Sequence, residues 1–144
     1  MPHDIWMWQI EKSLPSDNGA AQKLLEKVLA QLEKCCWQDR DVFGVRLAME
    51  EALINAIKHG NRLDQKKHVH VVCKLSPARI WIEIRDEGGG FDESSVPDPT
   101  APEYVERDSG RGIMLMRNFM SRVEYNDAGN SVVMEKLRSA DGAT

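Results

Sequence analysis

The chain has no apolar segment of the roughly 20 residues that a membrane-spanning helix needs. Its N-terminus also lacks the basic stretch followed by an apolar one that marks a secretory leader. Lys and Arg number 19 against 23 Asp and Glu, which gives a net charge of −4. Sequence-independent binding of nucleic acid depends on an excess of cations that neutralise phosphates. We therefore expect a cytoplasmic protein that contacts neither a membrane nor nucleic acid directly.

Cysteine is scarce as well. Cys35, Cys36 and Cys73 are odd in number, and adjacent cysteines rarely pair with each other. A zinc site would have to combine them with His68 and His70. In an extended segment, however, residues 68 and 70 face one side and residue 73 faces the other. Buried or unreactive thiols are the better interpretation.

Length and composition are those of one ordinary globular domain. The chain has 144 residues, of which 42% are apolar and 29% charged. We expect a single domain over 1–144, with its core over about 5–138. Residues 139–144 are expected to form a disordered tail.

The order of the expected elements favours an α/β two-layer sandwich. Apolar periodicity predicts a strand over 5–14 and a helix from Asn18 or Gly19 to about Cys36. Asp39 or Asp41 can cap a second helix that runs to about Lys58, where His59-Gly60-Asn61 ends it. Its apolar positions include Phe43, Leu47, Ile54 and Ile57. The remaining expected elements are strands over 69–75 and 79–86, a helix with apolar residues at 113, 115, 116 and 119, and strands over 122–125 and 131–137.

Sequential strand pairs with tight links predict a mixed, mostly antiparallel sheet with about three helices on one face. A doubly wound sheet would need strands that alternate with helices, and this order is absent. The chain also has no Gly-x-x-x-x-Gly-Lys-Ser/Thr segment, which excludes a P-loop nucleotide site.

The second expected helix carries the most informative pair of polar residues. Glu51 and Asn55 are four residues apart, so both lie on one face of the helix, beside small residues at 48, 52 and 56. A carboxylate that can accept a proton, next to an amide oxygen that can bind a hard cation, suits metal-assisted phosphoryl transfer. The spacing alone is more typical of a solvated helix face.

Two glycine-rich segments favour the phosphoryl-transfer interpretation over the solvated helix face. Asp86-Glu87-Gly88-Gly89-Gly90 follows a strand, and Ser109-Gly110-Arg111-Gly112 precedes a helix. Each could be a simple turn or helix start. Asp86, however, shares a strand face with three isoleucines, and a carboxylate on a buried face needs a partner from the protein or from a ligand.

Taken together and in this order, the three segments resemble the N, G1 and G2 boxes of the GHKL (Bergerat) ATP-binding fold of histidine kinase-like ATPases. The resemblance covers about residues 5 to 138 and is strongest to the anti-sigma factor serine/threonine kinases. It implies ATP and Mg²⁺ as cofactors, with the Mg²⁺ held by Asn55 and the adenine amino group by Asp86. His59 and Asn61 match the end of the N box, where ligand contact and helix termination both remain open. The remaining nucleotide-binding residues that it implies are Gly88, Gly90, Gly110, Arg111 and Gly112.

Glu51 separates the subfamilies. Histidine kinases commonly lack a glutamate at this place, and gyrase-like and Hsp90-like relatives need a second domain. The resemblance therefore implies a serine/threonine kinase, with Glu51 as the base that deprotonates a hydroxyl on an antagonist protein of the STAS fold. A sigma factor is the second partner it implies. An ATP-gated binding module without efficient transfer remains an alternative, and a detached histidine-kinase domain is a weaker one.

Two further segments bear on partners. Residues 93–108 are rich in proline and acidic residues, and long loops of this kind are often lids or binding segments. Trp6, Met7 and Trp8 allow two interpretations, either core packing or an exposed patch for a partner or for the second copy of a homodimer.

Overall fold

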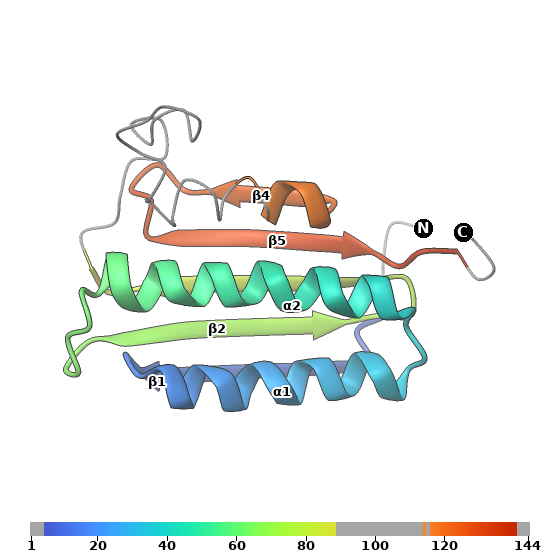
Figure 1. Ribbon diagram of the computed structural model, residues 1–144, viewed down its shortest axis with the longest axis horizontal. Coiled ribbons are helices and arrows are strands. Elements are labelled where there is room, and N and C mark those ends of the chain that lie inside the picture. The colour runs from blue at the N-terminus through green and yellow to red at the C-terminus, as the bar shows by residue number, and fades with distance from the viewer. Residues whose placement is uncertain (1–4, 89–113, 115, 141–144) are drawn as a thin grey trace.

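The computed structural model describes residues 5–88, 114 and 116–140 and shows a sheet covered on one face by helices (Figure 1). Its five strands lie in the order β1-β2-β3-β5-β4, and every neighbouring pair among them is antiparallel. In chain order the elements are β1 (Trp8–Pro15), α1 (Asn18–Lys34), α2 (Asp39–Ile54), the π-helix η1 (Asn55–Gly60), β2 (His68–Leu75), β3 (Arg79–Asp86), β4 (Arg122–Tyr125) and β5 (Ser131–Leu137).

The architecture confirms the α/β two-layer sandwich. Helices α1 and α2 lie side by side in front of the sheet, and residues 116–119 add a short helical turn near β4 (Figure 1). Gly44 of α2 lets this turn approach closely, because a Cβ there would lie 3.3 Å from the Cβ of Phe119. No helix in the described part of the chain is both long and apolar enough to span a membrane.

Helix α1 forms largely as its sequence predicts. The side chain of Asp17 caps it by accepting a hydrogen bond of 3.0 Å from the Ala20 N–H. The helix ends at Lys34, before the expected limit at Cys36, because Cys36 takes a left-handed conformation with φ 61°. Its buried residues recur at helical spacing (Ala21, Leu24, Leu25, Val28, Leu29 and Leu32).

Helix α2 differs from the prediction in how it begins and in which residues it buries. Gln38 is the N-cap and makes no side-chain cap bond, so the expected capping by Asp39 or Asp41 is wrong. Ile57 is buried, but Phe43 and Ile54 are 52% and 38% exposed. Small and medium residues such as Ala48, Met49 and Ala52 face the sheet instead.

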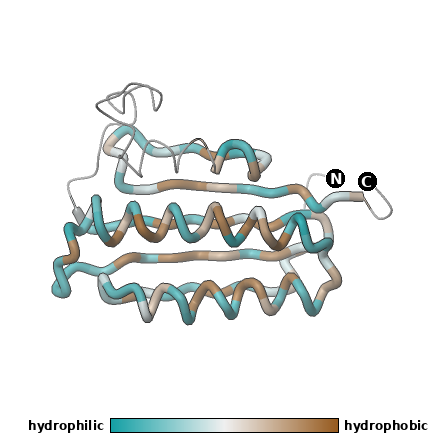
Figure 2. The backbone as a smooth tube through the Cα atoms, in the orientation of Figure 1, coloured by the Kyte–Doolittle hydropathy of each residue, from teal (hydrophilic) through white to brown (hydrophobic). Residues whose placement is uncertain are grey.

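In β2 and β3 every second residue is buried, and the residues between them are half-buried or, at Arg85, exposed. Ile80, Ile82 and Ile84 of β3 point into the core with Asp86 at the end of the same face, as predicted. On β2, Cys73 is buried while His68 and His70 lie on the other face, which confirms the geometry that separates them. Figure 2 shows the resulting recurrence of apolar residues along the helices and strands.

The two ends of the fold are shifted from the expected limits. Strand β1 begins at Trp8, whose ring packs partly against the core, whereas Met7 is 49% exposed. At the other end, Ser139 and Ala140 are held against the start of α2 by hydrogen bonds, so the expected tail over 139–144 does not begin at Ser139. Residues 141–144 lie outside the described residues.

Candidate functional site

The helix that carries Glu51 changes its winding where the candidate site begins. After Ile54 the chain continues as η1, in which the Asn61 N–H donates to the Ala56 carbonyl, five residues earlier, at 2.8 Å. Single π-turns of this kind occur frequently at functional sites. η1 ends at Gly60, which confirms His59-Gly60-Asn61 as the end of the helix.

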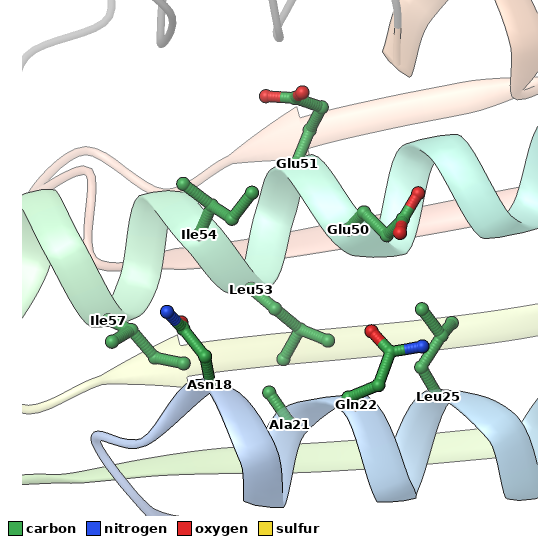
Figure 3. A pocket seen from close by; sticks show the side chains of 9 residues that line it. All are labelled: Asn18, Ala21, Gln22, Leu25, Glu50, Glu51, Leu53, Ile54 and Ile57. Carbon is green, nitrogen blue, oxygen red and sulfur yellow. The ribbon is translucent and has the colours of Figure 1, made fainter.

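Glu51 and Asn55 lie one turn apart but in different surroundings. Asn55 is 3% exposed, whereas the Glu51 side chain is half-buried and points away from α1 (Figure 3). The exposure of each group matches the chemistry expected of it. A base has to meet a hydroxyl from another molecule, while a cation ligand can stay inside the pocket.

The side chain of Asn55 combines one anchored atom with one unsatisfied atom. Its Nδ2 donates to the hydroxyl oxygen of Tyr125 on β4 at 3.4 Å. Its Oδ1 is buried and has no hydrogen-bond partner among the described residues. A buried polar atom without a partner is costly unless a ligand satisfies it, and an amide oxygen is a ligand that hard cations accept. The side-chain oxygen of Asn55 is therefore of the kind that can bind Mg²⁺.

Asn55 and Asp86 line one small pocket between α2, η1 and the sheet. Its other walls come from the end of β3, from Tyr125 on β4, from Asn130 and from the start of β5 at Ser131 and Val132. Backbone contacts fix its edge, since the Asp86 N–H donates to the Asn130 carbonyl at 2.9 Å. The pocket thus joins segments of the chain that are about 75 residues apart in sequence (from 55 to 130).

Gly60 lies close to the Asp86 carboxylate and to the backbone of Gly88. A Cβ on Gly60 would lie 2.3 Å from the Asp86 carboxylate, and a Cβ on Gly88 would lie 1.8 Å from the Gly60 carbonyl oxygen. Only glycine fits at both positions without displacement of backbone or carboxylate. The sequence predicted that Gly88 lets the backbone approach a nucleotide. In the described part of the chain, the absence of a side chain at Gly88 allows the Gly60 carbonyl to come close to it.

Asp86 is 6% exposed, and its carboxylate accepts the Gly88 N–H at 2.9 Å. Burial raises the pKa of this carboxyl, and the Gly88 hydrogen bond and the positive charge of Lys67 oppose the rise only in part. An ionised carboxylate accepts hydrogen bonds without donating any, so it selects a ligand that presents a donor such as an amino group.

Asn61 connects three segments of the chain beside the site through hydrogen bonds. It is 1% exposed and donates through Nδ2 to Ser16 Oγ and to the His68 carbonyl, both at 3.0 Å. Its Oδ1 accepts the Glu87 N–H at 2.8 Å. These three bonds tie the end of η1 to the residue after β1, to β2 and to the turn after Asp86, so Asn61 holds these segments together.

Glu87 fastens the same turn to β2. Its carboxylate accepts the His68 N–H at 2.8 Å and lies 2.9 Å from His70 Nε2. The backbone hydrogen bond from His68, followed by the bond with His70, lowers the pKa of Glu87. The turn that carries Asp86 and Gly88 is therefore held on both sides.

Of the other predicted site residues, the structure describes only His59. His59 is half-buried in η1, one turn beyond Asn55. Gly90, Gly110, Arg111, Gly112 and the expected lid at 93–108 lie outside the described residues. Among the residues that are described, no three His, Cys, Asp or Glu side chains come together as a metal cluster.

Sequence reasoning missed three polar contributors to the pocket. Tyr125, Asn130 and Ser131 reach it because β4 and β5 pair beside β3 in the order β3-β5-β4. Gly60 was identified only as a helix terminator, although its contact with Asp86 shapes the pocket edge. The alternation in 122–125 and 131–137 predicts two strands but not their place in the sheet.

Comparisons with known proteins agree with this geometry. The model of the family described as "Histidine kinase-like ATPase domain" matches residues 14–136. An anti-sigma F factor of Oceanobacillus iheyensis is 38% identical over 101 residues, which cover 66% of this chain and 68% of that protein. An anti-sigma F factor of Clostridium perfringens is 30% identical over 135 residues, covering 89% and 94%. The chain belongs to the anti-sigma factor family of histidine kinase-like ATPases.

A solved structure supports the fold of this anti-sigma factor family member. The crystal structure of the RsbU and RsbW domains of a Mycobacterium tuberculosis protein matches with a TM-score of 0.63 at 16% identity. The match covers 96% of this chain and 35% of that one. At this identity the likeness concerns the fold alone. The family match confirms an ATPase domain, and with it the prediction that the chain binds ATP.

Proposed function

We propose that this protein is an ATP-dependent serine/threonine kinase of the anti-sigma factor type, which phosphorylates an antagonist protein of the STAS fold. The observation that carries the proposal is the arrangement on α2 and η1. A half-buried carboxylate, Glu51, precedes by one turn a buried amide whose Oδ1 lacks a hydrogen-bond partner among the described residues. The first suits a base and the second a cation ligand.

ATP with Mg²⁺ supplies the phosphoryl group that is transferred. Asn55 Oδ1 would hold the cation, and the Asp86 carboxylate would accept a hydrogen bond from the adenine amino group. The backbone at Gly110 and Gly112 and the guanidinium of Arg111 would contact the phosphates, as the resemblance implies. Gly88, Gly90 and His59 would complete the surroundings of the nucleotide.

Glu51 would act as the general base toward the protein substrate. It accepts the proton of a serine or threonine hydroxyl while that oxygen forms a bond to the γ-phosphorus and the bond from phosphorus to the ADP oxygen breaks. The products are a phosphorylated side chain, ADP, and a protonated Glu51 that returns its proton to water. The position of Glu51 one helical turn before Asn55 supports this role.

The partners follow from the relatives. Several are named anti-sigma F factors, and we propose that this chain likewise sequesters a sigma factor and releases it through its antagonist. We further propose that it acts in the cytoplasm and as a homodimer.

Transfer of radiolabelled phosphate from ATP to candidate STAS-fold proteins from the same genome tests the kinase activity. Glu51→Gln should lower the transfer rate about 10²–10⁴-fold, the usual contribution of a positioned base. It should leave nucleotide affinity unchanged, since the amide is nearly isosteric with the carboxylate. Asn55→Ala should weaken Mg²⁺-dependent nucleotide binding as well as transfer, because it removes the unsatisfied Oδ1.

Two outcomes would redirect the proposal. If wild-type protein labels no candidate but binds one only in the presence of ATP, the chain is an ATP-gated binding module without useful transfer. If Glu51→Gln transfers phosphate at the wild-type rate, the base is another residue. Calorimetric titration with ATP and GTP serves as the control, because Asp86 should select the adenine amino group.

A further inference from the structure

A pocket between α1 and α2 adjoins the proposed base but belongs to no nucleotide subsite. Its floor consists of buried apolar side chains from both helices, Ala21 and Leu25 of α1 with Leu53 and Ile57 of α2–η1 (Figure 3). Its volume of about 310 Å³ is enough for side chains of a bound segment, at the lower end of the roughly 300–1,000 Å³ typical of ligand pockets.

The rim of this pocket is acidic. Glu50 and Glu51 stand along α2, and the polar residues opposite them on α1 are the uncharged Asn18 and Gln22. Among the residues that the structure describes, no Lys or Arg lines the pocket. Arg46, one turn before Glu50 on the same helix, pairs with Glu26 of α1 at 3.4 Å. An occupant with an apolar side chain and a positive charge would therefore complement both floor and rim.

Ile54 connects the pocket to the site of chemistry. It lies three residues after Glu51 and four after Glu50, so it is a neighbour of both on the helix surface. Its side chain is 38% exposed, although most apolar residues of this layer are buried. Glu51 itself lines the pocket and points outward at its edge, away from α1 (Figure 3). The apolar groove and the proposed base thus form one continuous surface.

From this continuity we infer that the pocket is the docking subsite for the segment of the antagonist that flanks its phosphorylated serine or threonine. This inference rests on the proposed kinase activity and deepens it. With the hydroxyl at Glu51, residues two or three positions away lie about 7–10 Å distant along an extended chain, within reach of Ile54 and the floor. The segment carries an apolar side chain that enters the pocket and a basic side chain that pairs with Glu50.

The test compares variants of the full chain with the antagonist that wild-type protein labels. Ile54→Arg should raise the KM for the antagonist about tenfold or more, the size expected for a central contact residue. It should raise by the same factor the Kd for the antagonist measured by calorimetry with ADP present. The Kd for ATP should stay within about twofold. Ile54→Leu should behave as wild type, because it keeps the apolar contact.

Phe43→Arg is the matched control. Phe43 lies on the same helix, is 52% exposed, and is eleven residues from Ile54, about 16 Å along the axis. It introduces the same charge outside the pocket and should leave both antagonist constants unchanged. If Ile54→Arg lowers the unfolding midpoint, Glu50→Lys decides instead, since it alters only a charge on the rim.

The outcomes separate the two proposals. If wild-type protein transfers phosphate and Ile54→Arg and Glu50→Lys keep wild-type KM and Kd for the antagonist, the docking subsite is refuted and the kinase stands. If the variants lose a sigma factor and keep the antagonist, the pocket has a different occupant and the inference is again refuted. If wild-type protein neither labels nor binds any STAS-fold candidate, both proposals fall together.

Discussion

A polar side chain is buried toward each end of the α2–η1 segment, and the two side chains differ in how fully they are hydrogen-bonded. Asp41, near the start, is 1% exposed, and its two oxygens accept the Ser139 N–H at 2.9 Å and the Ser139 hydroxyl at 2.7 Å. The ammonium of Lys136 lies 3.8 Å away. Asn55, toward the other end, is 3% exposed and donates through Nδ2 to the Tyr125 hydroxyl at 3.4 Å, while its Oδ1 has no partner among the described residues.

The difference distinguishes a buried polar group that stabilises the fold from one that is available to a ligand. A buried polar group costs free energy unless hydrogen bonds replace its water, and nearly all such groups in proteins are satisfied. Asp41 is satisfied by the protein itself, so its role is to hold the C-terminal segment to α2. Asn55 keeps one atom for a ligand. Residues of similar burial on one helical segment should therefore respond to mutation in opposite ways.

The largest expected effect is at Asp41. Asp41→Ala should lower the free energy of unfolding by about 2–3 kcal/mol, because it leaves the Ser139 donors without their acceptor and removes the carboxylate that lies near Lys136. ATP affinity should stay within about twofold. Urea denaturation and calorimetry measure the two quantities. Ser139→Ala is the control and should cost less, since it removes only the hydroxyl bond. A loss of ATP affinity without loss of stability would contradict the comparison.

Asp86 should respond in the opposite direction. Asp86→Asn should weaken ATP binding by about 1–3 kcal/mol through loss of a charged acceptor. It should not lower the stability of the nucleotide-free protein at pH 7, because the amide oxygen can still accept the Gly88 N–H and no longer carries a buried charge.

The pH dependence gives a second measurement for this variant. The folded protein raises the pKa of Asp86 above its ordinary value of 3.8, so the contribution of this group to stability is present below that value and is lost as pH rises through the raised pKa. The stability of Asp86→Asn relative to wild type should therefore grow as pH rises from 3 to 7. Urea denaturation across this range would contradict the assignment if the difference were constant or fell.

The smallest expected effect is at Tyr125. Tyr125→Phe removes the hydroxyl that accepts the Asn55 Nδ2–H and so frees the amide to turn. The affinity for ATP with Mg²⁺ should fall by about 0.5–1 kcal/mol, whereas the affinity measured with EDTA should not change. Equal losses under both conditions would mean that the ring packs against the nucleotide and does not orient Asn55.

The elements of this fold were largely predictable because local physics fixes them. Alternation of the buried Val69, Val71 and Cys73 with half-buried, mostly polar residues defines β2, and the leucine spacing of α1 defines its buried face. The predicted cap at Asp41 was wrong because a residue 98 positions away, Ser139, offers its side chain two hydrogen bonds. A side chain that can cap a helix can also bond elsewhere, and only packing decides between the two.

The candidate site also combines features that the sequence predicts with features that only packing decides. The spacing of Glu51, Asn55 and His59 and the glycines after Asp86 already indicated which residues to examine, because i, i+4 neighbours and the need for glycine are local properties. The wider turn at Asn55, the contact between Gly60 and Gly88, and the docking pocket beside Ile54 depend on how the layers pack.

The sequence by itself determined the identities and order of the chemical groups, since helix period and strand alternation are set by neighbouring residues. The tertiary structure alone decided which of these groups remain unsatisfied. Strand order β3-β5-β4 brings Tyr125 to one atom of Asn55 and leaves the other without a described partner. That choice depends on contacts across 70 residues, and such contacts form only when the apolar faces of the sheet and helices are buried together.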